Sequence, residues 1–170
     1  AIYGCLLGHE TIHEEMKDED LVKLITQLGY NEGLPVVVDP KILSPKKFID
    51  EVINVRLPNP FMPDTPQRIA TDTSQKLAIR FGNTLENHLA AGKDIADIKA
   101  IPLVYAGWFR YLVGLDDNGD KFELSADPLF DELLPQFEGV TLGSEADKDV
   151  IYDLLRNEKI FGLNIVEAGL

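Results

Sequence analysis

The sequence is poor in cysteine, in long apolar runs and in basic residues. Cys5 is the single cysteine among 170 residues, so an internal disulfide is excluded and a reducing compartment, the cytoplasm, is expected. The longest apolar stretch, Ile101 to Phe109, is far too short to span a bilayer. Lys and Arg number 16 against 29 Asp and Glu, which gives a formal net charge of −13. Such a surface repels phosphate backbones and anionic membranes, so neither nucleic acid nor a membrane is expected as a partner.

The glycine-rich strand–turn–helix fingerprint of dinucleotide-binding folds is also lacking, so a complete fold of that kind is not expected. What is present is the composition of an ordinary globular domain, with 45% apolar and 26% charged residues. The length suits one domain. The apolar pattern is already under way at Ile2, as if a helix were entered in its middle. We therefore expect the chain to be a piece of a larger protein.

Apolar residues recur at intervals of three and four in segment after segment, which is the period of amphipathic helices. Proline and glycine mark the boundaries: Gly82 is expected to interrupt one helix and Pro102 to kink or split another. The predicted fold class is mainly α, a multi-helical domain with at most a small β-hairpin near residues 116–124. The expected helices span residues 1–17, 18–28, 45–53, 66–81, 85–91, 94–115, 128–137 and 144–156, with further helix at the C-terminal end.

His9, Glu10 and His13 match the spacing of zinc-dependent hydrolases, in which two histidines four residues apart on a helix bind the metal. Glu10 would activate the bound water, and Glu32 follows at a distance where a third ligand could lie. The alternative is that both histidines lie on the apolar face of a helix, because they share a stripe with the apolar residues between Ile2 and Met16. We favour this alternative and expect no metal, since a zinc protease needs a substrate-binding strand before the helix.

Asp116, Asn118 and Asp120 resemble the opening of a calcium-binding loop. The glycine that such a loop needs at its sixth position is replaced by Lys121, whose charge opposes calcium. A plain turn is therefore the favoured interpretation.

Arg68, Asp72 and Lys76 are spaced four apart, so a helix beginning at Pro66 would carry them on one stripe. One interpretation is a surface ladder of ion pairs that contributes little to stability. The other is a cationic wall for an anionic or polyhydroxy ligand, in which Asp72 holds the two cations in place. Arg80 would add a third cation to the same helix.

Three segments together resemble the C-terminal domain of the long-chain mannitol dehydrogenase family, which includes mannitol 2-dehydrogenase, fructuronate reductase and tagaturonate reductase. They are LLGHETIHEEM at residues 6–16, IATDTSQKLAIRF at residues 69–81 and AGWFRYLVGLDDNGD at residues 106–120. The resemblance covers Ala1 to about Pro135.

The resemblance implies a helical domain, residues 1–170, that lies on the substrate side of a two-domain dehydrogenase. An N-terminal Rossmann domain would bind NAD or NADP, and a polyol or sugar acid would lie between the two domains without a metal. It also implies a catalytic Lys-x4-Asn-x2-His signature immediately before Ala1, so this chain would hold no catalytic residue. The substrate-binding positions that it implies here are Lys76 and Arg68, with Asp72 in support.

Two classes of function thus follow from the sequence. The first is the substrate-binding part of an NAD(P)-dependent oxidoreductase that interconverts a polyol or aldonate and its keto sugar, inactive as this chain alone. The second is a stand-alone helical binding or interaction module.

Overall fold

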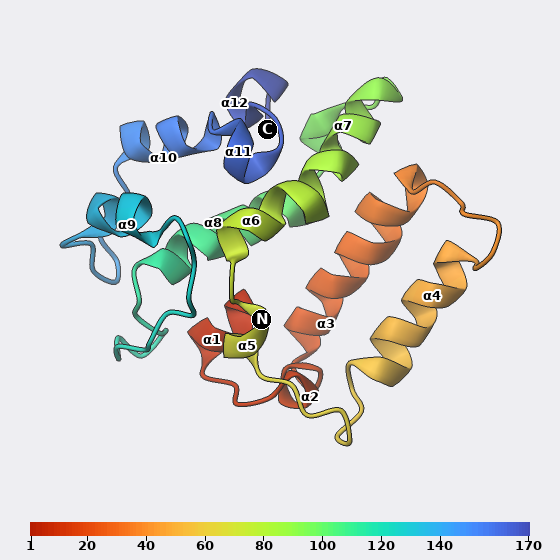
Figure 1. Ribbon diagram of the computed structural model, residues 1–170, viewed down its shortest axis with the longest axis horizontal. Coiled ribbons are helices and arrows are strands. Elements are labelled where there is room, and N and C mark those ends of the chain that lie inside the picture. Colours follow the sequence, from red (N-terminus) through yellow and green to blue (C-terminus); the bar gives the residue numbers. More distant parts are fainter.

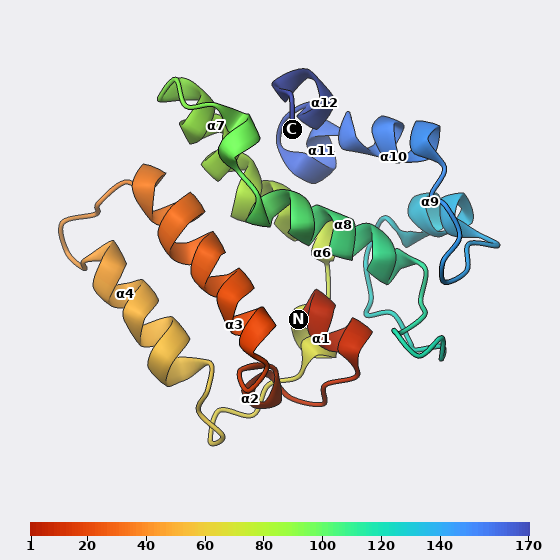
Figure 2. The same cartoon turned by 180° about the vertical axis from the view of Figure 1, so that it is seen from behind.

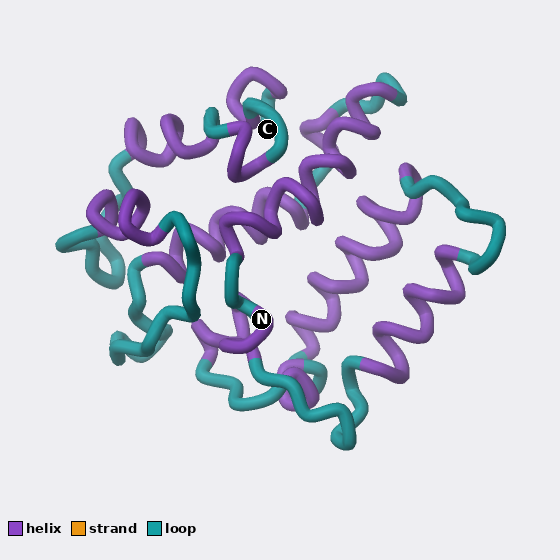
Figure 3. The backbone as a smooth tube through the Cα atoms, viewed as in Figure 1, coloured by secondary structure: helices purple, strands orange, loops and turns teal.

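The computed structural model describes residues 1–170, which form helices joined by loops (Figures 1 and 3). The prediction of a mainly α fold is confirmed. The only β pairing is an isolated antiparallel bridge between Leu115 and Lys121. It lies near residues 116–124, where the sequence predicts at most a small hairpin. The α-helices are α1 (Ile2–Leu7), α2 (Ile12–Glu15), α3 (Glu19–Thr26), α4 (Pro45–Glu51), α5 (Pro66–Ile69), α6 (Thr73–Leu77), α7 (Asn83–Ala90), α8 (Ala100–Leu112), α9 (Phe130–Leu133), α10 (Lys148–Leu155), α11 (Glu158–Phe161) and α12 (Ile165–Ala168).

Three of these helices continue without a break into π-helical segments, whose wider turn is often found at functional sites. α3 runs into η1 (Gln27–Gly33), α4 runs into η3 (Val52–Arg56), and α6 runs through η4 (Ala78–Gly82) into α7. Short 3-10 helices complete the set: η2 (Leu34–Val36), η5 (Ile95–Asp97) and η6 (Leu134–Phe137).

α3–η1 and α4–η3 form an antiparallel helical hairpin on one side of the molecule (Figures 1 and 2). Each helix begins at a side-chain cap: the Asp18 carboxylate accepts from backbone N–H groups of α3, and the Ser44 hydroxyl accepts from Lys47 N–H. The helices approach closely at Gly29, where an added Cβ would lie 3.2 Å from a methyl group of Ile49.

The core surrounds α8, which runs through the middle of the molecule between the hairpin and the C-terminal helices α10–α12 (Figure 2). Trp108 and Tyr111 of α8 are fully buried. α1 crosses α8 at Gly107, where an added Cβ would collide with the ring of Tyr3 at 2.6 Å. On the opposite side, the ring of Phe161 in α11 packs edge-on against Tyr105, with centroids 4.8 Å apart.

The first predicted helix, residues 1–17, is wrong in one respect, because it is two helices. Gly8 adopts a left-handed conformation, φ +74°, and ends α1. Thr11 then starts α2 with a capping box: its hydroxyl accepts from Glu14 N–H while the Glu14 carboxylate accepts from the backbone of Thr11.

The helix predicted over residues 66–81 is also broken, at Asp72 and not at Gly82. α5 ends at Ile69, Asp72 takes the left-handed conformation with φ +55°, and α6 starts afresh at Thr73. Gly82 interrupts nothing, since helix continues through it to Ala90. Gly82 instead gives room to the backbone of α11: an added Cβ would lie 2.5 Å from the carbonyl oxygen of Phe161.

Candidate functional site

The zinc-like histidines do not share a helix. His9 lies in the link between α1 and α2, with its Nε2 atom 3.9 Å from a carboxylate oxygen of Asp18. His13 lies in α2, with its Nδ1 atom 2.6 Å from the carbonyl oxygen of Pro58. Because Gly8 breaks the helix before His9, the expected common stripe of the two imidazoles is wrong, and no group of three His, Cys, Asp or Glu side chains is placed to hold a metal.

Glu32, considered above as a third zinc ligand, caps the central helix instead. Its side chain is 2% exposed, and its two carboxylate oxygens accept the backbone N–H groups of Lys99, Ala100 and Ile101 at 2.7–2.9 Å. These are N–H groups that the start of α8 leaves without an intrahelical partner. The carbonyl oxygen of Glu32 also lies 2.7 Å from Nε2 of the buried His88.

The calcium-like segment is a turn. The carboxylate of Asp116 accepts the backbone N–H groups of Asn118 and Asp120 at 2.9 and 2.8 Å. These bonds lower the pKa of Asp116 below its usual value, because they favour the charged carboxylate. The Asp116 carboxylate therefore stabilises the turn through these hydrogen bonds.

Arg68 and Lys76 lie on different helices, so the ladder on one helix is wrong. Arg68, in α5, pairs with Asp64 rather than with Asp72, and its Nε atom is 2.5 Å from an Asp64 oxygen. This pairing lowers the pKa of the Asp64 carboxyl group. Asp72 separates the two helices, and its side chain makes no hydrogen bond or ion pair with either cation. Its backbone N–H donates to the carbonyl oxygen of Ala126 at 2.9 Å.

Lys76 is half-buried and held by the backbone of the broken segment. Its Nζ atom donates to the carbonyl oxygens of Ile69 at 3.0 Å and Thr71 at 2.5 Å. These carbonyls are freed because α5 stops at Ile69 and the chain turns at Asp72. The ammonium group is therefore positioned by main-chain oxygens, and the supporting role expected of the Asp72 carboxylate is not found.

The start of α6 is held by Asp127, which is 53 residues further along the chain. Its carboxylate accepts from the backbone N–H of Ser74 at 2.8 Å, from the Ser74 hydroxyl at 2.5 Å and from the Thr73 hydroxyl at 3.2 Å. The Thr73 hydroxyl oxygen in turn accepts the indole N–H of Trp108 at 3.0 Å. The Thr-Ser-Gln-Lys and Gly-Trp-Phe-Arg segments of the sequence thus meet in one hydrogen-bond network that fixes the helix carrying Lys76.

An open cleft of about 520 Å³ lies between the α4–η3 helix, the loop that follows it, and residues of α2, α5 and η4. Phe48, Val52 and Met62 supply apolar walls. Lys76 and Arg68 do not line the cleft, but their partners do: Ile69, whose carbonyl oxygen accepts from Lys76, and Asp64, which pairs with Arg68. Arg56 and Arg80 also line it. The sequence had singled out Arg80 as an additional cation but not Arg56, because no spacing along the chain relates residue 56 to residue 80.

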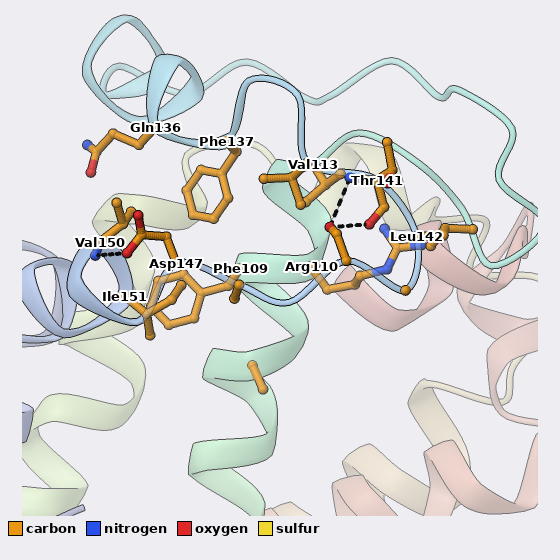
Figure 4. A pocket seen from close by; sticks show the side chains of 15 residues that line it. Phe109, Arg110, Val113, Gln136, Phe137, Thr141, Leu142, Asp147, Val150 and Ile151 are labelled. Carbon is orange, nitrogen blue, oxygen red and sulfur yellow. Dashed lines mark hydrogen bonds between the residues drawn. The ribbon is translucent and has the colours of Figure 1, made fainter.

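A second cavity, of about 360 Å³, lies between α8 and residues 136–151 (Figure 4). Its walls are mainly apolar, with Phe109, Phe137 and Ile151 among them. The guanidinium group of Arg110 is committed to the carbonyl oxygens of Leu115 and Asp116, at 2.5 and 2.8 Å.

Comparison with known proteins agrees with this helical architecture. A family model described as the mannitol dehydrogenase C-terminal domain matches residues 1–169. A D-mannonate oxidoreductase of Thermotoga maritima is 50% identical over the whole chain, which covers 32% of that protein. A mannitol 2-dehydrogenase of Emericella nidulans is 29% identical over 97% of the chain, which again covers 32% of its length. The chain thus spans about a third of the length of these relatives.

Solved structures show the same fold. A Pseudomonas fluorescens mannitol 2-dehydrogenase, in a ternary complex with NAD and D-mannitol, superposes with a TM-score of 0.79 at 24% identity, over 98% of this chain and 33% of that one. A substrate-free D-sorbitol dehydrogenase gives a TM-score of 0.71 at 22% identity, over 99% of this chain and 35% of that one. None of the helices of this chain combines the length and apolarity needed to cross a membrane.

Proposed function

Because the chain belongs to the mannitol dehydrogenase C-terminal domain family, we propose that it is the substrate-side domain of an NAD(P)-dependent oxidoreductase that interconverts a polyol or an aldonate and its keto sugar. The observation that carries this proposal is the match of the family model over residues 1–169, joined by 50% identity to a D-mannonate oxidoreductase. A stand-alone interaction module has no observation in its favour.

The cofactor belongs, in this proposal, to a Rossmann domain that precedes residue 1 in a protein about three times as long. The chain itself does not fit a dinucleotide, because it has no sheet and no glycine-rich turn between a strand and a helix. The proposed catalytic lysine, asparagine and histidine would also precede Ala1. The proposed compartment is the cytoplasm, where the thiol of Cys5 stays reduced.

Lys76 is proposed to bind substrate oxygens that are remote from the reacting carbon. An ammonium group has three N–H donors, and the carbonyls of Ile69 and Thr71 take two of them, so one remains for a hydroxyl or carboxylate oxygen. Arg68 assists from α5, where its pairing with Asp64 leaves part of its guanidinium fork available.

The test is the kinetics of the full-length enzyme with D-mannonate and D-mannitol as substrates. Lys76→Ala is expected to lower kcat/KM by about 10- to 150-fold with either substrate, since a hydrogen bond from a charged group contributes about 1.5–3 kcal/mol. The exposed neighbour Gln75→Ala is the matched control on the same helix and should leave kcat/KM unchanged.

A folded Lys76→Ala enzyme with normal kcat/KM would exclude the substrate role. A full-length wild-type enzyme that oxidises no polyol or aldonate with NAD or NADP, D-mannitol and D-mannonate included, would contradict the proposed function itself.

A further inference from the structure

We propose that the buried carboxylate of Glu15 accepts a hydrogen bond from a basic side chain in the segment that precedes Ala1, and that it thereby positions the acid–base group of the reaction. The proposal rests on the proposed function, in which the catalytic residues lie in that segment. It adds a positioning residue that belongs to this chain.

Glu15 and Glu32 are the two buried carboxylates of the structure, and only Glu32 is satisfied within the chain. Glu15 is 3% exposed and Glu32 is 2% exposed. The oxygens of Glu32 accept three backbone N–H groups. In Glu15, Oε1 has no hydrogen-bond partner, and Oε2 accepts only from the terminal nitrogen of Ala1 at 3.2 Å. A carboxylate that is removed from water without a charged partner is strongly destabilising, so Glu15 needs a further donor.

The nitrogen of Ala1 does not supply the missing charge in a longer protein. Where a residue precedes Ala1, this nitrogen belongs to a peptide bond and carries one N–H group and no charge. No Lys, Arg or His side chain of the chain lies within ion-pair distance of Glu15. The nearby Cys5 thiol is neutral, because burial raises its pKa to about 11. The charge of Glu15 is therefore met from outside residues 1–170.

α1 makes room for this carboxylate by means of a glycine. A Cβ added to Gly4 would lie 1.8 Å from Oε1 of Glu15 and 2.9 Å from Cγ of Pro66. Glycine inside a helix is destabilising relative to alanine, so its presence here needs a reason. The reason is packing: only without a side chain at Gly4 does the Glu15 carboxylate lie against the backbone of α1.

α5 connects this carboxylate with the lysine proposed to bind substrate. Pro66, the first residue of α5, borders Gly4 together with Glu15, and Ile69, the last residue, accepts from Lys76 through its carbonyl oxygen. A helix of four residues is only about 6 Å long. The N-terminus lies in the middle of the molecule, beside α1 and α5 (Figures 1 and 2). A chain that arrives there therefore passes close to the proposed substrate site.

A carboxylate at this place has a defined effect on an acid–base group. The group that takes the hydroxyl proton of a polyol or an aldonate must be unprotonated when oxidation starts. A neighbouring carboxylate stabilises the protonated form of a basic group and raises its pKa. Glu15 thus holds the group in one orientation and sets the pH above which oxidation proceeds.

The experiment is the pH dependence of oxidation by the full-length enzyme, with the polyol or aldonate that the wild type oxidises best. Glu15→Gln removes the charge with little change of shape. It is expected to lower kcat by about 10- to 100-fold with KM within about threefold, because a misplaced acid–base group slows the chemical step rather than substrate binding. The acid limb of kcat/KM should move to lower pH by about one unit or more, since the basic group loses the charge that favours its protonated form.

Two further variants separate charge from shape. Glu15→Asp keeps the charge on a shorter side chain, so it should keep the acid limb of the wild type while part of kcat is lost. Glu19→Gln removes the same charge from an exposed position at the start of α3 and is the matched control, with kcat and pH profile unchanged.

A crystal structure of the full-length protein gives a readout that does not depend on turnover. A nitrogen atom of a Lys, Arg or His that precedes residue 1 is expected within about 3 Å of Oε1 of Glu15. A structure in which only water or backbone N–H groups meet this carboxylate would overturn the proposal.

Normal kcat in Glu15→Gln, or a lower kcat with an unshifted acid limb, would also overturn the positioning role while leaving the oxidoreductase function in place. If Glu15→Gln does not fold, the crystal structure of the wild type decides. If the wild-type enzyme oxidises no polyol or aldonate, the proposed function fails, and the same structure still decides whether a basic side chain meets Glu15.

Discussion

Burial controls the chemistry of the one thiol in this chain. Cys5, on α1, is 4% exposed, and burial raises the pKa of its thiol to about 11, with the charge of Glu15 acting in the same direction. Because only the thiolate is nucleophilic, Cys5 is expected to react slowly near neutral pH. The limited access of a reagent to α1 slows the reaction further.

At pH 8 the thiolate fraction of Cys5 should be about 100-fold smaller in the folded protein than after unfolding, since a shift of about two pKa units changes that fraction by this factor. Alkylation by iodoacetamide should slow at least in that proportion, which mass spectrometry of the Cys5 peptide with and without denaturant measures. Similar rates in both states would show that the thiol is neither buried nor shifted.

Residues whose role depends on distant neighbours were the hardest to assign from sequence. Lys76 and Arg68 stood out through their type and spacing, and their role as substrate ligands remains a prediction. Glu32 was considered only as a third metal ligand, and its capping role was missed because nothing local shows that residues 99–101 come to meet it. Arg56 lines the cleft between η3 and η4 and was not singled out, because nothing along the chain relates it to that cleft.

At the scale of single elements, local signals predicted helix starts better than helix breaks. The helices predicted to begin at residues 45 and 66 do begin at Pro45 and Pro66, and each is capped by the side chain before the proline, Ser44 or Thr65. The break at Asp72 was missed, since an aspartate inside a helical pattern gives no strong stop signal. What stabilises the break is tertiary: the N–H of Asp72 bonds to Ala126 and α6 is capped by Asp127.

The remote cap of α6 can be tested directly. Asp127→Ala removes the acceptor of Ser74 N–H and of the Ser74 and Thr73 hydroxyls, so it should lower the free energy of unfolding by about 1.5–3 kcal/mol, the contribution of a hydrogen bond to a charged group. It should also lower kcat/KM, because Lys76 is positioned by α6. Denaturant unfolding and kinetics of the full-length enzyme measure the two effects.

Asp131→Ala, an exposed aspartate in α9, is the matched control and should change neither quantity. An Asp127→Ala enzyme as stable and as active as the wild type would show that α6 needs no remote cap.

At the scale of the whole molecule, the composition and the helical period were enough to predict a mainly α domain, whereas the arrangement of its helices was not predictable in the same way. Polar contacts between residues far apart in sequence join the α3–η1/α4–η3 hairpin to the core. Glu32 is the centre of these contacts, since its carboxylate caps α8 and its carbonyl oxygen meets His88 of α7.

Glu32 is therefore expected to couple the hairpin to the core. In Glu32→Gln the amide group places N–H donors against the N–H groups of residues 99–101, so at least one buried bond is lost and unfolding should become easier by about 1.5–3 kcal/mol. Hydrogen exchange of the full-length protein should then become faster in residues 19–56 and at the start of α8. Residues 103–112, in the rest of α8, should still exchange only through global unfolding.

Glu51→Gln, an exposed change in the same hairpin, serves as the control. If exchange in the Glu32→Gln protein rose by the same factor in the hairpin and throughout α8, the hairpin and core would be one cooperative unit, and Glu32 would stabilise the fold without acting as a separate link between its parts.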